Sequence, residues 1–86
     1  MLSRHEIEKI LSTALDAAKK RNALAADSFR AVMNEVPSGV PAADGTFRVE
    51  RAGAERRTAL RELQIALKRY NGFMVLGVIP EEFKNR

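Results

Sequence analysis

Residues 4–36, RHEIEKILSTALDAAKKRNALAADSFRAVMNEV, decide the fold of this chain. Their apolar residues recur at intervals of three and four, the spacing that places side chains on one face of an α-helix. The apolar residues form two groups, and at about 100° per residue both groups fall within one arc of about 140°. The first group is Ile7, Ile10, Leu11, Ala14, Leu15 and Ala18, and the second is Ala25, Phe29, Val32, Met33 and Val36.

A helix start is encoded at the beginning of this stretch. Ser3 and Glu6 match the S-x-x-E capping box, in which the hydroxyl and the carboxylate each accept a hydrogen bond from a free backbone amide. Leu2 and Ile7 stand at the two positions of a hydrophobic staple, which fixes the angle at which the chain enters the helix. We therefore predict a helix that begins at Arg4.

The continuity of this helix depends on its middle. Residues 1–36 contain neither Gly nor Pro, so one unbroken helix is the preferred interpretation. The alternative is a break between residues 22 and 28, where Asn22 or Asp27 would cap a second helix. Asn22 is also a polar residue that lies inside the apolar arc. It therefore fits either a coiled coil, in which a buried asparagine fixes the register, or an ordinary bundle helix with a bend.

The rest of the chain predicts a second helix that folds back on the first. Pro37 and Pro41 bound a loop that continues to Gly45. Residues 46–50 carry a weak strand pattern that also fits the entrance of a helix. The second helix is predicted over residues 54–70, with the pair at 71–72, Asn-Gly, as its left-handed stop. Its core face is predicted to be Ala59, Leu60, Leu63, Ala66, Leu67 and Tyr70.

The C-terminal segment is the most hydrophobic part of the chain. Residues 73–79, FMVLGVI, are predicted to be extended or sharply turned, and Pro80 is predicted to begin one closing helical turn. The predicted fold class is all-α, with residues 1–86 forming one small helical domain. In this fold a long or bent N-terminal helix packs against an antiparallel second helix, and a short apolar extended or turn segment follows.

Composition is that of a small globular protein. The chain has 86 residues and no cysteine, with 45% hydrophobic and 30% charged residues. A chain of this size buries only about 60–65% of its unfolded surface, so a partner or a second copy would add stability that no disulfide supplies. The N-terminus lacks the apolar core of a signal peptide, and no apolar run is long enough to span a bilayer. We expect a cytoplasmic protein without a membrane span.

The positive charge is concentrated in one region. The net charge is +4, and residues 45–70 hold seven bases against three acids, whereas bases and acids balance elsewhere. On a helix, Arg57, Arg61 and Lys68 project within about 40° of one another. They are the candidate surface for an anionic partner, which would be an acidic protein or, less favoured, a nucleic acid. The competing interpretation is a solvated helix face, since the stripe matches no DNA-binding motif.

A second candidate surface is apolar. The stripe over residues 7–36 is longer than a helix over residues 54–70 can cover, which suggests that another molecule covers the remainder. We therefore predict a non-enzymatic interaction module that self-associates or serves as a small subunit of a larger assembly, and the alternative function is nucleic-acid binding. The candidate interface residues are Phe29, Val32, Val36, Phe73 and Val75.

The sequence offers little for catalysis. His5 and Glu8 lie three residues apart, as half of a metal site would, but His5 is the single histidine of the chain. The five glycines form neither a P-loop nor a dinucleotide-binding motif. There is no cysteine and no G-x-S-x-G motif to supply a nucleophile. We therefore expect no enzymatic activity, no cofactor and no metal.

Overall fold

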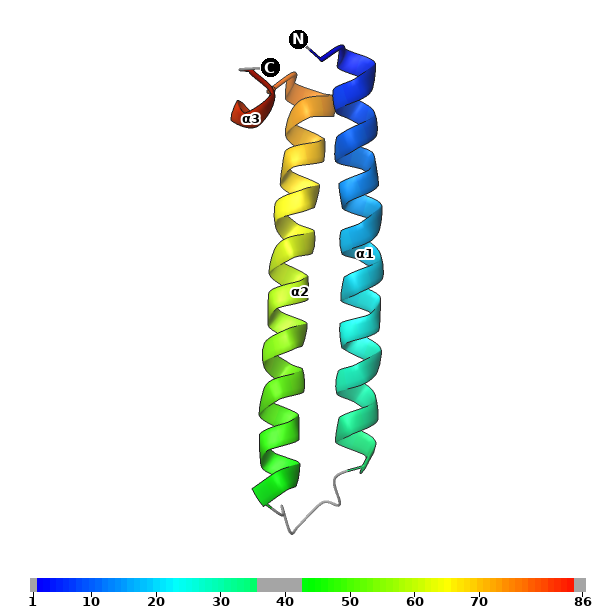
Figure 1. Cartoon of the computed structure of the whole chain (residues 1–86), viewed down its shortest axis with the longest axis vertical. Coiled ribbons are helices and arrows are strands. Elements are labelled where there is room, and N and C mark those ends of the chain that lie inside the picture. Colours follow the sequence, from blue (N-terminus) through cyan, green and yellow to red (C-terminus); the bar gives the residue numbers. More distant parts are fainter. Residues whose placement is uncertain (1, 36–42, 85–86) are drawn as a thin grey trace.

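The protein is an antiparallel helical hairpin, shown in a computed structural model. The structure describes residues 2–35 and 43–84, and for residues 43–46 it describes the backbone only. Helix α1 spans Arg4–Glu35 and helix α2 spans Ala43–Leu76, and a four-residue helix α3 follows at Glu81–Lys84. The two long helices lie side by side, so that both ends of the chain lie at the same end of the hairpin (Figure 1).

Helix α1 is continuous through the region of Asn22, which confirms the preferred interpretation and excludes the break. Its start is also confirmed. The amide of Glu6 donates to the hydroxyl of Ser3 at 3.1 Å, and the amide of Ser3 donates to Glu6 Oε1 at 3.2 Å. The hydrogen bond from the Ser3 amide to the carboxylate, and after it the interaction with the Ser3 side chain, favour the charged form and lower the pKa of Glu6 below its usual 4.5. The predicted capping box is therefore formed in full.

Helix α2 is much longer than predicted. It begins eleven residues before Ala54 and continues six residues beyond Tyr70, so the predicted boundaries are wrong at both ends. The weak strand pattern at residues 46–50 lies inside α2. Gly72, predicted to stop the helix, has no positive φ and is an ordinary helical residue. The local helix-breaking signals at residues 53 and 71–72 are overridden by the packing of α2 against α1.

The actual stop is Gly77, five residues later. Its φ of 71° lies in the left-handed region that glycine adopts without strain. Its amide donates to the carbonyl of Phe73 at 3.1 Å, and the amide of Val78 donates to the carbonyl of Gly72 at 3.0 Å. The predicted extended segment at residues 73–79 is therefore half helical. Its first four residues end α2, and only the last three leave the helix.

The two helices meet along a seam with the spacing of a coiled coil. Buried and half-buried positions alternate at intervals of three and four residues on both helices, which is a heptad repeat. The exception to this burial is Arg56, which occupies a seam position but is exposed. Along α1 the seam contains Leu11, Leu15, Ala18, Asn22, Ala25, Phe29 and Val32, and along α2 it contains Val49, Ala52, Arg56, Ala59, Leu63, Ala66, Tyr70 and Phe73.

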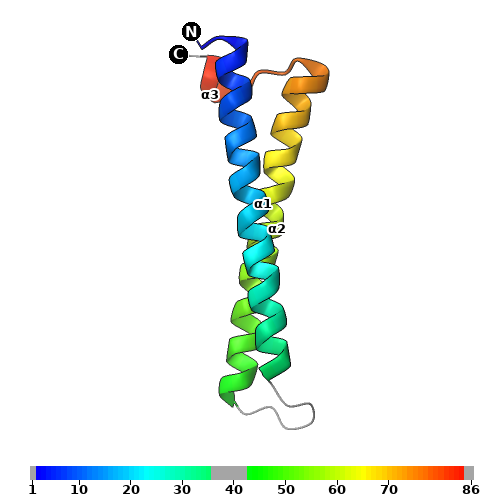
Figure 2. The same ribbon diagram turned by 90° about the vertical axis from the view of Figure 1, so that its right-hand side faces the viewer.

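Large buried side chains are concentrated at the end of the hairpin where the chain termini lie. Ile7, Leu11, Phe73 and Phe83 form one cluster, and Leu2, Tyr70 and Ile79 pack against it. Phe73 is 1% exposed, and the guanidinium of Arg4 lies 5.0 Å from the centre of its ring. After α2 the chain turns back over this end of the hairpin (Figure 2), and Phe83 of α3 joins the cluster with Ile7 and Leu11 of α1. The predicted closing turn after Pro80 is confirmed.

The hairpin is 57 Å long and 18 Å across. Because α2 has 34 residues and α1 has 32, the second helix runs along the whole of the first. The predicted mismatch in length between the two helices is therefore wrong, and the case for a partner has to rest on side chains that the hairpin leaves exposed. None of the helices within residues 2–35 and 43–84 combines the length and the hydrophobicity needed to cross a membrane.

Candidate interaction surface

The seam divides the hairpin surface into two flanks, and one of them is charged. Arg21 Nε donates to Glu62 Oε2 at 3.0 Å across this flank, and Arg48 forms a second ion pair with Glu35. The two α1 partners are fourteen residues apart, as are the two α2 partners. Fourteen residues are two heptads, so both ion pairs bridge the same side of the helix pair. We call this side the charged flank.

The opposite flank is apolar. On α2, Leu60, Leu67 and Met74 each directly follow a seam residue and repeat every seven residues, whereas Glu62 directly precedes one. Positions before and after the seam lie on opposite sides of it, so these three side chains face away from the charged flank. They are 45%, 37% and 37% exposed. On α1 the matching line carries half-buried Ala26 and Met33, which is 47% exposed. We call these five residues the apolar flank.

Phe29 connects the two helices at the floor of this flank. One shallow hollow is lined by Phe29 together with Ala26, Met33, Arg30 and Arg56, and an adjoining one by Phe29 with Gly53, Arg56, Arg57 and Leu60. The guanidinium of Arg56 lies 5.2 Å from the centre of the Phe29 ring, within the range of a cation–π contact. The hollows therefore combine an aromatic floor with cationic walls.

Gly53 of α2 lies against the Phe29 ring. A Cβ atom added there would lie 3.5 Å from Phe29 Cε2 and 3.4 Å from Arg57 Nη1, which is ordinary van der Waals contact, so the site accepts an alanine. Gly53 is buried and has no positive φ. Gly53 is therefore an ordinary buried helical residue beside the Phe29 ring, whereas the sequence pattern predicts that the helix starts after it.

The predicted basic stripe borders the apolar flank. Arg57, Arg61 and Lys68 are exposed, and in the described part of the chain none of the three forms an ion pair. Arg57 lies one turn before Leu60, and the stripe as a whole is displaced by about 100° from the line of Leu60 and Leu67. Long arginine and lysine side chains reach across such an angle.

The α1 side of the apolar flank is basic as well. Lys19 lies on the same heptad line as Ala26 and Met33, and Arg30 lines one of the hollows. Two carboxylates, Asp16 and Glu50, lie on the adjacent lines of α1 and α2. Bases therefore outnumber acids along both borders, so the fixed charges beside the apolar flank are net positive.

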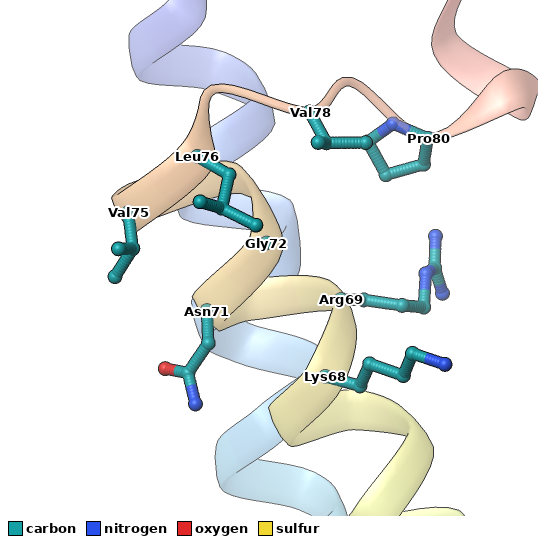
Figure 3. Close-up of a pocket in the computed structure, with 8 residues that line it drawn as sticks. All are labelled: Lys68, Arg69, Asn71, Gly72, Val75, Leu76, Val78 and Pro80. Atoms are coloured by element: carbon teal, nitrogen blue, oxygen red, sulfur yellow. The ribbon is translucent and has the colours of Figure 1, made fainter.

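A separate apolar groove lies on the outer side of α2 near its end (Figure 3). It has a volume of about 880 Å³ and runs beneath the segment that carries Val78 and Pro80. Its walls include Val75 and Leu76, which are 77% and 76% exposed. Gly72 lies on its floor. The remaining lining residues are Lys68, Arg69 and Asn71, and Arg69 is engaged in an ion pair with Glu82 of α3.

The predicted interface residues are dispersed rather than brought together. Phe29 and Val32 are half-buried in the seam, and Phe73 is buried in the core at the other end of the hairpin. Val75 is exposed in the groove, and Val36 lies outside the described residues. The residues of the apolar flank were missed as a surface because Leu60 and Leu67 were assigned to the core face. Their seven-residue repeat is the signal that identifies them as a separate line.

The described residues contain no cluster of three His, Asp or Glu side chains that could hold a metal ion, and the side chain of His5 is exposed. Comparison of the chain with protein-family models, with curated proteins and with solved structures finds no match. The surface itself is therefore the guide to function.

Proposed function

We propose that this chain is a non-enzymatic protein–protein interaction module, which self-associates or serves as a small subunit of a larger assembly. The observation that supports this is the difference between the two flanks. One is closed by ion pairs between the helices, whereas the other leaves Met33, Leu60, Leu67 and Met74 between 37% and 47% exposed along one side. Covering each of these side chains would contribute about 1–2 kcal/mol.

The size of the hairpin supports the same proposal. Its buried side chains in the middle of the seam are mostly alanines, such as Ala18, Ala52 and Ala59, which allow close helix approach but bury little area. A two-helix domain of this kind gains stability when a third or fourth helix covers its free side. An interaction partner would therefore stabilise the fold as well as use it.

Native mass measurement tests the proposal. The protein is isolated from its own host under native conditions, and the purified chain is examined separately by sedimentation equilibrium at micromolar concentration. We expect a mass above that of one chain in at least the first measurement. A monomer in both measurements, with a native melting transition, would refute the proposal.

Nucleic-acid binding is the second candidate function, because Arg57, Arg61 and Lys68 are exposed on one line without ion pairs among the described residues. Three phosphate contacts predict a slope of about −2.7 in a plot of log affinity against log salt on duplex DNA. Replacing Arg61 with alanine should reduce the slope by about one unit. The absence of any mobility shift of DNA or RNA at low salt would eliminate this candidate.

A further inference from the structure

The apolar flank has the geometry of a docking site for a helix. Leu60, Leu67 and Met74 repeat every seven residues on α2, and Ala26 and Met33 do so on α1. By the register of the Glu35–Arg48 pair, Ala26 and Met33 lie level with residues 57 and 50, so the α1 line ends where the α2 line begins at Leu60, and the two lines follow each other along the flank. A third helix with its own apolar heptad repeat can lie over both lines and form a three-helix bundle. Glu35 pairs with Arg48, so Met33 lies about level with residue 50. The flank therefore extends over about 24 helical residues, or roughly 36 Å.

The charge around the flank selects the kind of helix. On the α2 border Arg57, Arg61 and Lys68 are exposed and without ion pairs in the described ranges, and on the α1 border Lys19 is equally exposed and unpaired. In coiled coils the residues that flank the apolar line of each helix pair with opposite charges on the neighbouring helix. A helix with aspartate or glutamate at these positions complements both borders at once.

The same charges argue against a second copy of this chain on the apolar flank. Packing two apolar flanks against each other would bring the two basic borders together, and like charges placed opposite each other are destabilising. Nucleic acid fits the flank poorly, because phosphates gain nothing from four exposed aliphatic and thioether side chains, and the one aromatic ring at the floor is already covered by Arg56.

We propose that the apolar flank binds an amphipathic helix of a partner protein whose apolar heptad line is bordered by acidic residues. This inference depends on the proposed function as an interaction module and adds the surface, the conformation and the charge of the partner. Leu60, Leu67, Met74 and Met33 supply the apolar contact. Arg57, Arg61 and Lys68 set the preference for acidic residues.

A pair of synthetic helices tests the proposal. Each peptide has about 28 residues with leucine and alanine on one heptad line. The flanking positions are glutamate in the first peptide and lysine in the second. Binding of the labelled peptides to the full chain is measured by fluorescence anisotropy. We expect the glutamate peptide to bind at least tenfold more tightly than the lysine peptide, and added salt to reduce the difference.

Matched variants locate the site. Leu60→Ser combined with Leu67→Ser should weaken binding of the glutamate peptide at least tenfold. Ile65→Ser, on the outer surface of α2 toward the charged flank and 54% exposed, should change it less than twofold. Arg61→Glu should weaken binding several-fold, whereas Arg51→Glu, on α2 toward the charged flank and beside Arg21 and Glu62, should have little effect. Circular dichroism melts of each variant check that the hairpin is folded, and Arg61→Glu provides an exposed substitution that leaves the seam intact.

The remaining outcomes overturn the proposal in distinguishable ways. Equal or tighter binding of the lysine peptide contradicts the predicted charge, and equal loss of binding in the Ile65→Ser control contradicts the predicted surface. If the chain self-associates and the Leu60/Leu67 variant becomes monomeric, the occupant is a second copy, so this inference fails while the proposed function survives. If neither peptide binds and the native mass is that of one chain, both fail.

Discussion

Gly72 and Gly77 provide a paired test of the fold, because the structure assigns opposite signs to the same substitution at two sites five residues apart. Gly72 lies inside α2 with no positive φ, and no atom lies within 4 Å of an added Cβ. Glycine inside a helix costs about 0.5–1 kcal/mol relative to alanine. With neither contact nor strain to offset the gain, Gly72→Ala should stabilise the hairpin by about that amount.

Gly77 has equally open surroundings, so only its backbone differs. A non-glycine residue in the left-handed region costs about 1–2 kcal/mol, and Gly77 has a φ of 71°. Gly77→Ala should therefore destabilise the hairpin by about that amount. In a domain of this length 1 kcal/mol corresponds to about 4–8 °C in the melting temperature. Gly72→Ala should consequently have a higher melting temperature than the wild type, and Gly77→Ala a lower one.

Thermal and urea unfolding followed by circular dichroism at 222 nm measure both effects. Urea unfolding gives the free energy independently of the melting temperature, provided that the slope of the transition is unchanged. A destabilised Gly72→Ala variant would refute the reasoning, because it would mean that the helix stops at residues 71–72 as the local sequence alone predicts. A neutral Gly77→Ala variant would contradict the assigned C-terminus of α2.

Three further predictions follow from the core, the ion pairs and the cap. Phe73→Ala should lower the free energy of unfolding by about 3–5 kcal/mol, so that much of the chain is already unfolded at 25 °C at the start of a urea titration. Val75→Ala, at an exposed site, should change the free energy of unfolding by less than about 0.5 kcal/mol. Arg21→Glu and Glu62→Arg should each lower the melting temperature slightly, and the double variant should restore it. Because both side chains are about half exposed, the coupling energy between them should be about 0.2–1 kcal/mol. The pKa of Glu6 is lowered in the folded chain, so the stabilising contribution of its carboxylate is present above pH 4.5 and is lost as the pH falls through the folded pKa. Glu6→Gln keeps an acceptor for the Ser3 amide but does not titrate, so it should flatten the dependence of melting temperature on pH in this acidic range.

Local signals in the sequence were sufficient for helix α1 and not for helix α2. The capping box at Ser3 and Glu6 and the uninterrupted apolar spacing act within a few residues, so they specify the start and the continuity of α1. From the local sequence alone, Gly53 and Gly72 predict interruptions of the helix. In the structure, contact with α1 along the seam stabilises helix at both positions, and a tertiary contact of this kind leaves no mark in the local sequence.

The seam of α2 was hidden for a related reason. Val49, Ala52, Ala59 and Leu63 keep the three-and-four spacing only if Arg56 is counted among them, and an arginine does not register as a core position. It is tolerated there because its guanidinium leaves the seam to cover the ring of Phe29.

The candidate surface was predicted only in its charged half. Arg57, Arg61 and Lys68 could be placed on one line from helical geometry alone, and the structure keeps them exposed. Leu60 and Leu67 could not be separated from the core face. Which apolar line of a helix is buried depends on how close the neighbouring helix approaches. The alanines in the seam let α1 and α2 approach closely, so the seam is narrow and the next line of side chains, which includes Leu60 and Leu67, stays outside it.

The largest buried side chains lie where the two chain ends meet, and this reverses the usual order in which a domain opens. Termini normally exchange their amide hydrogens first. Here protection should be greatest around Leu11 and Phe73 and least toward Glu35 and Arg48, whose ion pair joins two exposed side chains. The half of the hairpin around Met33 and Leu60 would then open locally most often. A third helix bound along it would therefore slow amide hydrogen exchange most in that half.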